Sequence, residues 1–157
     1  KDSLFSWSAL DRDVMDKTSA ELLPEDGNSR NSTVYEAEDA DVQGVFQKKE
    51  VKKQTGIFFG KGIKNSISWN VSVGLAQVYA LRFKYMNATD VPVKVRMQFI
   101  DAKGIVLRND ELTFAATPGK WRLLSTTTGS YVNAGHYRVV LSAADMDGLA
   151  LDALEVQ

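Results

Sequence analysis

Three acidic side chains near the two ends of the domain have the type and spacing that metal binding requires. Glu36 and Glu38 stand two residues apart in the stretch YEAEDA. If this stretch is a β-strand, both carboxylates point to the same side, about 7 Å apart. Asp152 shares one face of the predicted strand LALDALEV with Ala150, Leu154 and Val156, which predicts a buried position. A buried carboxylate is costly unless it is paired or metal-bound.

Calcium is the metal that these three carboxylates suit, because it takes six to eight oxygen ligands and needs no nitrogen or sulfur. The side chains of Glu36, Glu38 and Asp152 converge if the first and last strands are neighbours. In the alternative, both glutamates are exposed and Asp152 accepts hydrogen bonds from backbone amides. The residues by themselves leave both interpretations open.

A catalytic constellation is missing from the sequence. The chain has no cysteine and a single histidine, His136, near the start of a predicted strand. We find no nucleophile elbow, P-loop, zinc-protease helix or dinucleotide-binding loop. Two carboxylates on one strand cannot stand on both sides of a glycosidic bond. We therefore expect a chain that is not an enzyme.

Length and charge limit the classes of protein and of ligand that remain possible. The 157 residues, 44% hydrophobic and 25% charged, suit one globular domain, and no apolar run approaches the ~20 residues of a membrane helix. Residues 1–42 carry eleven acids and four bases, whereas residues 43–157 carry nine acids and fifteen bases. Six lysines fall in QKKEVKKQTGIFFGKGIK. They indicate either a solvated, lysine-guarded strand edge or a basic rim for an anionic ligand. Nucleic acid is not expected, because no known motif accompanies the lysines.

Hydrophobic residues recur with a period of two from residue 35 onward. The pattern predicts strands over residues 66–73, 78–86, 91–100, 136–142 and 149–156, separated by turn sequences such as NATD, DAKG and TPGK. The aromatic residues Trp69, Tyr79 and Tyr85 lie on the apolar faces. The fold class is therefore all-β, an antiparallel β-sandwich of about nine or ten strands.

Residues 1–34 have a different character and are expected to be a lead-in from an upstream domain. Trp7, Leu10, Val14 and Met15 are at near-helical spacing, and the stretch PEDGNSRNST reads as a linker. Because the first residue is lysine rather than methionine, we expect a piece of a longer or processed chain. The sandwich domain is expected over residues 35–157.

Four short motifs occur in an order that resembles a known family. They are YEAE near the start, YALRFKYMN in the middle, TPGKW followed by NAGHYRVVL, and LDALEV at the end. Together they resemble carbohydrate-binding modules of families 6 and 35, which have a galactose-binding-like β-jelly roll. The C-terminal part looks most like modules at the ends of bacterial glycoside hydrolases, including those of family 2.

The resemblance implies a structural calcium ion held by Glu36, Glu38 and Asp152. It also implies a sugar site in the loops, with Phe58 or Phe59 as one aromatic platform and Trp121 as a second. For Trp121, packing in the core remains the alternative to a role as platform. The polar candidates in the same loops are Lys61, Lys64, Asn87 and Lys120. Two positions depart from the family pattern, since Leu124 and Ala150 stand where a tryptophan and an asparagine are common.

The resulting expectation is a non-catalytic, monomeric carbohydrate-binding module of an extracellular, cell-surface or periplasmic bacterial enzyme. Its partners would be an upstream catalytic domain and a polysaccharide, which the lysines suggest is an acidic plant glycan such as pectin. The alternative is a structural or spacer domain that kept the sandwich and lost the sugar site. The sequence does not decide whether the loop end or a sheet face binds the sugar.

Overall fold

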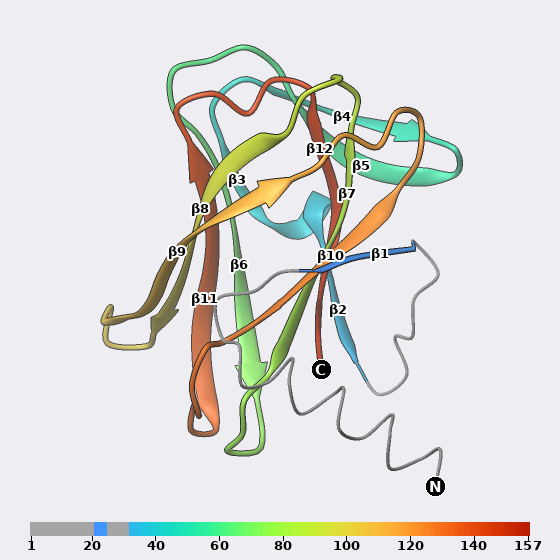
Figure 1. The fold of residues 1–157 in the computed structure, drawn as a ribbon. Helices are drawn as coiled ribbons and strands as arrows, with labels where there is room; N and C mark the ends of the chain where they lie inside the picture. The colour runs from blue at the N-terminus through green and yellow to red at the C-terminus, as the bar shows by residue number, and fades with distance from the viewer. Residues whose placement is uncertain (1–20, 25–31) are drawn as a thin grey trace, which may run out of the picture.

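The computed structural model describes residues 21–24 and 32–157, which form two antiparallel β-sheets packed as a sandwich (Figure 1). One sheet has the order β1 (Glu21–Pro24), β10 (Arg122–Thr127), β7 (Ala80–Asn87), β12 (Leu149–Val156), β5 (Gln54–Phe59) and β4 (Phe46–Val51), and β2 (Thr33–Glu36) also pairs with β12. The other has the order β3 (Asp41–Gln43), β6 (Asn65–Val73), β11 (Gly135–Ala143), β8 (Val93–Asp101) and β9 (Val106–Phe114). The predicted all-β sandwich is confirmed.

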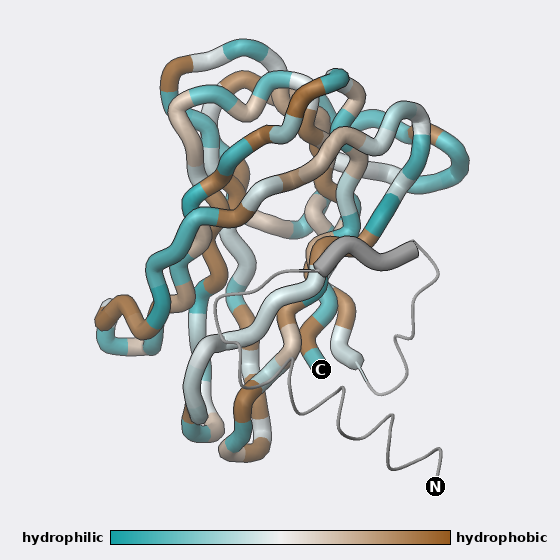
Figure 2. The backbone as a smooth tube through the Cα atoms, in the orientation of Figure 1, coloured by the Kyte–Doolittle hydropathy of each residue, from teal (hydrophilic) through white to brown (hydrophobic). Residues whose placement is uncertain are grey.

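The core lies between the sheets and is built from the alternating apolar residues of both. Trp69 of β6 contacts the ring of Phe83 of β7 across the sandwich, with 6.0 Å between ring centroids. Tyr85 of β7 meets Phe114 of β9 at 4.8 Å. Trp69, Tyr79 and Tyr85 are buried, as predicted. Figure 2 shows the alternation of hydrophobic and hydrophilic residues along the strands that produces this core.

The last strand, β12, is buried along its whole length. All eight of its residues are buried, and its backbone pairs with β7 on one side and with β5 and then β2 on the other. A β-bulge interrupts the pairing with β7 between Leu151 and Ala153, at Asp152. Bulges redirect the side chains beside them. The bulge therefore sets the direction of the Asp152 carboxylate.

The opening stretch YEAEDA is not one continuous strand, and this corrects the sequence prediction. Strand β2 ends at Glu36, and a 3₁₀ helix, η1, covers Ala37–Asp39 with Ala37 fully buried. Glu36 and Glu38 therefore do not share one face of a strand. The helix connects β2 in one sheet to β3 in the other.

The strand count exceeds the expected nine or ten, with twelve strands in the described residues. Strands of three or four residues, such as β2 and β3, are too short for alternation to reveal.

Strand β1 lies within the N-terminal segment, residues 1–34, that was expected to be a lead-in. The lead-in around Trp7 to Met15, expected to be a short helix or irregular, falls outside the described residues. No helix in the described part of the chain is long and apolar enough to cross a membrane.

Five connections gather at one end of the sandwich, at the top of Figure 1. They follow β3, β5, β7, β9 and β11 and include residues 60–64, 88–92 and 115–121. The pairing of Asn87 with Leu149 and of Asn65 with Ala143 places them together. This loop end holds most of the predicted sugar-site residues.

A hairpin formed by β4 and β5 extends sideways from the sandwich, closed by a two-residue turn at Lys52 and Lys53. Their φ angles are 53° and 67°, in the left-handed region. Asn-Gly is the preferred sequence for such turns, and a side chain with a Cβ atom costs roughly 1–2 kcal/mol per residue there. The turn therefore holds two lysines in a conformation that other residues adopt more easily.

The phenol of Tyr85 makes alkaline stability a test of the core. It donates a hydrogen bond of 2.9 Å to the carbonyl of Ala115, and burial raises the pKa of Tyr85 to about 12. The unfolded chain ionises this phenol near its ordinary value of about 10, so stability should fall as pH rises from about 10 towards 12. Urea midpoints at pH 8 and 11 should differ less in Tyr85→Phe than in the wild type. Tyr131→Phe, at a position 73% exposed, is the control and should behave as the wild type. An equal loss of stability between pH 8 and 11 in Tyr85→Phe and in the wild type would contradict the prediction.

Candidate functional site

Strand β2, which carries Glu36, pairs with the last strand, β12, as the calcium hypothesis required. Glu36 pairs with Ala153 of β12, directly beside Asp152. Partial burial raises the pKa of the Glu36 carboxyl, and the negative charges of Asp152, Glu38 and Asp39 raise it further. These carboxylates therefore repel one another, although Glu36 and Glu38 are both exposed to solvent.

A lysine from the neighbouring strand supplies a positive charge at this place. Lys84 of β7 lies with its Nζ 3.6 Å from Oδ2 of Asp152 and donates a hydrogen bond of 3.1 Å to Oε1 of Gln54. The side chains of Lys84 and Asp152 are 15% and 8% exposed. Burial raises the pKa of Glu155, which the charges of Arg82 and Lys84 oppose. Lys84 thus stands among carboxyls of β2 and β12.

The fit to calcium is incomplete in this arrangement. The donors are of the right chemical type, but among the described residues no group of three or more acidic, histidine or cysteine side chains lies close enough to hold a metal ion. Glu38 lies on the 3₁₀ helix rather than on β2. The residues as placed do not form a calcium site, and calcium at Glu36, Glu38 and Asp152 stays a prediction from the resemblance.

The predicted aromatic platforms lie largely inside the protein. Phe59 is 4% exposed and belongs to the main core, so Phe58 is the phenylalanine that faces outward. Phe58 is half-buried against the edge of Trp121, with 5.9 Å between centroids, and Lys49 Nζ lies 4.8 Å above its ring. Trp121 is 1% exposed and donates a hydrogen bond to the carbonyl of Val51. Core packing, the alternative that the sequence left open for Trp121, is what the structure shows.

Glycine at position 56 makes room for this packing. A Cβ atom there would lie 2.9 Å from Cη2 of Trp121 and 3.0 Å from the carbonyl oxygen of Leu151. The indole therefore lies across the backbone of β5. Leu124 and Ala150, which depart from the family pattern, are buried as well, so neither position offers a side chain to a ligand.

Asn87 is also a structural residue. It is fully buried, and its Nδ2 donates hydrogen bonds to the carbonyls of Val91 and Phe114. Its Oδ1 accepts hydrogen bonds from the backbone and hydroxyl of Thr89. With these partners Asn87 fixes the loop after β7 instead of presenting its amide to a sugar.

The three predicted loop lysines are exposed at the loop end, and they belong to two different loops. Lys61 and Lys64 follow β5, and Lys120 precedes β10. Only Lys64 lines one of the hollows described below. The predicted aromatic residues therefore form a packed cluster, whereas the three predicted lysines lie in two separate loops.

A hollow of about 680 Å³ lies at the loop end, on the side of the five-stranded sheet. Lys64 and Arg96 bring two positive charges to it, and Ser66 and Ser142 bring hydroxyl groups. These residues meet because β6, β11 and β8 are adjacent, with Ser66 opposite Ser142 and Ser142 opposite Arg96. The remaining lining residues are Gln43, Ile63, Asn65, Ala143 and Ala144.

Asn65 holds the rim of this hollow in place. It is 1% exposed; its Oδ1 accepts a hydrogen bond of 3.0 Å from the backbone of Val45, and its Nδ2 donates one to the carbonyl of Gly60. Two chain segments are thus tied to the first residue of β6. Ile63 lies between these anchored points and is 85% exposed, so its side chain offers an apolar contact at the rim.

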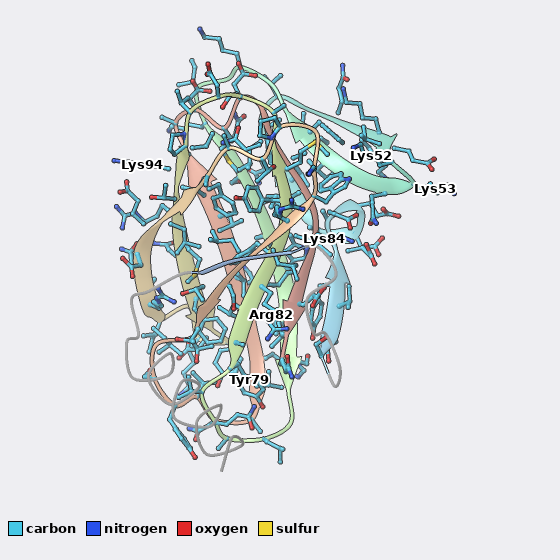
Figure 3. All side chains as sticks on the ribbon, turned by 45° about the vertical axis from the view of Figure 1, so that its right-hand side comes forward. Lys52, Lys53, Tyr79, Arg82, Lys84 and Lys94 are labelled. Carbon is cyan, nitrogen blue, oxygen red and sulfur yellow. The ribbon has the colours of Figure 1, made fainter. Side chains whose placement is uncertain are left out.

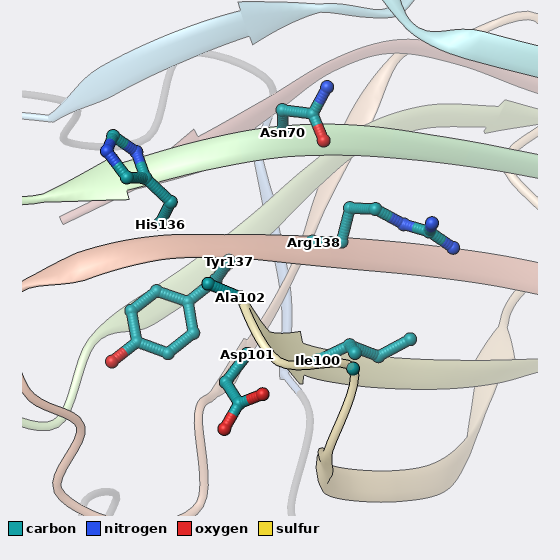
Figure 4. Close-up of a pocket in the computed structure, with 8 residues that line it drawn as sticks. Asn70, Ile100, Asp101, Ala102, His136, Tyr137 and Arg138 are labelled. Atoms are coloured by element: carbon teal, nitrogen blue, oxygen red, sulfur yellow. The ribbon is translucent and has the colours of Figure 1, made fainter.

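A smaller hollow of about 270 Å³ lies at the opposite end of the same sheet (Figure 4). His136 and Arg138 of β11 face it, together with Asn70 of β6 and Asp101 at the end of β8. His136 Nδ1 is already hydrogen-bonded to the Ser72 hydroxyl at 2.7 Å. Asp101 Oδ1 accepts hydrogen bonds from the backbone of the following turn. These contacts indicate a structural rather than a binding role for both side chains.

Sequence reasoning identified Lys64 but missed Arg96, Ser66 and Ser142. Each occupies an outward position of a predicted strand, and that alternation was the available signal. What the sequence did not reveal is the strand order β6-β11-β8, which brings the three strands together. Pairing between distant strands depends on the whole topology, and local periodicity carries no information on it.

The pair of Lys84 and Asp152 yields a stability prediction. Lys84→Met should lower the free energy of unfolding by about 3 kcal/mol, because breaking a largely buried ion pair leaves a carboxylate without its ammonium partner. Urea denaturation measures the loss. Lys94→Met, at an exposed position, is the control and should leave stability nearly unchanged. A loss of similar size in both variants would contradict the assignment.

A chelator tests the calcium prediction separately. A calcium ion bound only to the folded chain must raise its melting temperature. The melting temperature of the wild type should then fall when excess EDTA is added and recover with calcium. An unchanged value would rule out calcium at Glu36, Glu38 and Asp152.

The buried indole yields a second stability prediction. Trp121→Ala should cost about 3–5 kcal/mol of stability by leaving a cavity beside Phe58 and Gly56, again measured by urea denaturation. Phe46→Ala is the control, because Phe46 is 40% exposed. Lost glycan binding with unchanged stability would instead identify Trp121 as a platform.

Comparison with known proteins gives matches among solved structures only: no family model matches the chain, and no curated protein does. A family 35 carbohydrate-binding module from Clostridium thermocellum is 21% identical, with a TM-score of 0.65 over 80% of this chain and 97% of the module. The C-terminal family 6 module of LamC, a marine laminarinase from Zobellia galactanivorans, is 19% identical, with a TM-score of 0.64 over 81% of this chain and 99% of the module.

A third similar structure is the module CBM6cm-2 from Cellvibrio mixtus lichenase 5A, in complex with cellotriose. It is 16% identical, with a TM-score of 0.60 over 80% of this chain and 95% of the module. At these identities the likeness concerns the fold. The described chain has the β-sandwich fold of family 6 and family 35 carbohydrate-binding modules, as the motifs at its two ends predicted.

Proposed function

We propose that this chain is a non-catalytic carbohydrate-binding module and that its sugar site is the hollow lined by Lys64, Arg96, Ser66 and Ser142. The observation that carries the proposal is this concave surface, lined by two cations, hydroxyl groups and apolar side chains, at the loop end of a fold shared with carbohydrate-binding modules. Its volume of about 680 Å³ lies within the range of known ligand sites.

The lining supports a sugar that bears a carboxylate. Arg96 can form two parallel hydrogen bonds with a carboxylate, and Lys64 adds a second positive charge. The hydroxyls of Ser66 and Ser142 can donate to or accept from sugar hydroxyls. Ile63 offers an apolar surface to the C–H face of a ring. We therefore propose an acidic plant polysaccharide, such as the uronate polymer of pectin, as the ligand class.

The position of the hollow suits a module attached to an enzyme. Val156 at the end of β12 pairs with Thr33 at the start of β2, at the end of the sandwich opposite the loops. A glycoside hydrolase joined upstream, on the side of Thr33, would leave the hollow open to a polymer. Binding there would raise the effective concentration of polysaccharide near the enzyme, outside the cell or in the periplasm.

The rival proposal is a spacer domain without sugar binding. It is favoured by the burial of Trp121 and by a lining that contains no aromatic side chain. Aromatic rings commonly form the apolar part of ligand sites. The two proposals differ in whether the wild type binds any glycan.

Affinity gels with polygalacturonate test the proposal. The wild type should be retarded, and Arg96→Ala with Lys64→Ala should bind about tenfold more weakly, because a bidentate arginine contact and a second charge are lost. The control is Lys103→Ala, which removes an exposed lysine from the turn after β8, at the far end of the sheet. It should bind as the wild type.

Salt and neutral glycans complete the test. Binding should weaken between 20 and 500 mM salt, because exposed ion pairs are screened. Retardation by neutral glycans alone would contradict the acidic ligand, and no retardation by any glycan would support the spacer.

A further inference from the structure

The β4–β5 hairpin carries the most concentrated positive charge that the proposed sugar site does not use. Residues 46–59 hold four lysines, Lys48, Lys49, Lys52 and Lys53, against the single acid Glu50. All four are exposed. In the part of the chain that the structure describes, no ion pair joins Lys48, Lys52 or Lys53 to an acidic residue.

The hairpin also projects from the sandwich. Strand β5 pairs with β12 only at Ile57 and Phe58, after which β2 takes its place beside β12. The residues towards the turn therefore have β4 as their pairing partner. Figure 3 places Lys52 and Lys53 at the outer end of this arm.

Protection of a sheet edge explains only part of this charge. Strand β4 is an edge strand, and lysines on an edge oppose pairing with other chains. That explanation covers Lys48 and Lys49, which lie within the strand. It does not cover Lys52 and Lys53, because the turn offers no edge for another chain to pair with.

The backbone of the turn adds an independent observation. Among the described residues, Lys52 and Lys53 are the non-glycine residues with positive φ. Asparagine and glycine adopt this turn without that cost. Lys52 and Lys53 are adjacent, exposed and held in a strained backbone conformation, which points to a function for their side chains.

We propose that the β4–β5 hairpin is a second contact for the acidic polysaccharide, in which Lys52 and Lys53 bind carboxylates of the polymer outside the hollow. This inference rests on the proposed function. The ammonium groups of Lys52 and Lys53 form ion pairs with successive uronate groups, and the rigid two-residue turn keeps the two charges together. A polymer that contacts both the hollow and the hairpin dissociates more slowly than one that contacts either alone.

The experiment replaces the two lysines with the residues that the turn prefers. Lys52→Asn with Lys53→Gly should raise the melting temperature, because the strain is removed, and should weaken binding to polygalacturonate at low salt about two- to thirtyfold. The salt dependence of binding should also decrease. Higher stability with weaker binding cannot be explained by misfolding.

The matched control keeps both the charge and the strain. Lys52→Arg with Lys53→Arg should bind polygalacturonate as the wild type does, with an unchanged melting temperature. Fully methyl-esterified polygalacturonate, which lacks the carboxylates, should bind the wild type and the Asn-Gly variant equally.

The outcomes separate this inference from the proposed function. Equal affinity of wild type and Asn-Gly variant for polygalacturonate would overturn the hairpin contact and leave the hollow intact. Wild-type binding to DNA as tight as to polygalacturonate would overturn the assignment to a polysaccharide. If the wild type binds no glycan, the proposed function fails as well.

Discussion

The burial of β12 is the constraint on which the rest of the structure depends. This strand is covered on both faces and paired along both edges, so every polar group on it needs a partner within the protein. Asp152 meets Lys84, and Ala150 packs beneath Trp121 and Phe58. The indole of Trp121 is therefore occupied in covering β12 and is 1% exposed.

This constraint divides the loop end into two halves with different chemistry. On the side of β5 and β10, Trp121 and Phe58 close the surface over Gly56. On the side of β6, β11 and β8, outward serines and Arg96 leave an open hollow. Packing of the sandwich leaves cations, hydroxyl groups and an apolar contact accessible in this hollow. The proposed recognition of a sugar uses these groups.

The sequence predicted what alternation and residue type determine locally. Trp69 and Tyr85 were placed in the core, and the calcium hypothesis required the strand of Glu36 to lie beside the last strand, as β2 does. The predictions failed where the backbone leaves regular geometry, as in the 3₁₀ helix that separates Glu36 from Glu38. They were also incomplete where the proposed site depends on strand order, since nothing local to Arg96 indicates that Ser142 lies beside it. Which of Phe58 and Phe59 faces outward follows from the pairing register, which the sequence left undetermined.

The central claim is a sugar site in the hollow beside the five-stranded sheet. Its most direct test is to map the backbone amide NMR shifts while the protein is titrated with oligogalacturonate. The amide signals of Ser66, Arg96 and Ser142 should move in a saturable way while the indole signal of Trp121 stays in place. Shifts confined to residues 115–121, or none with any acidic or neutral oligosaccharide, would contradict it.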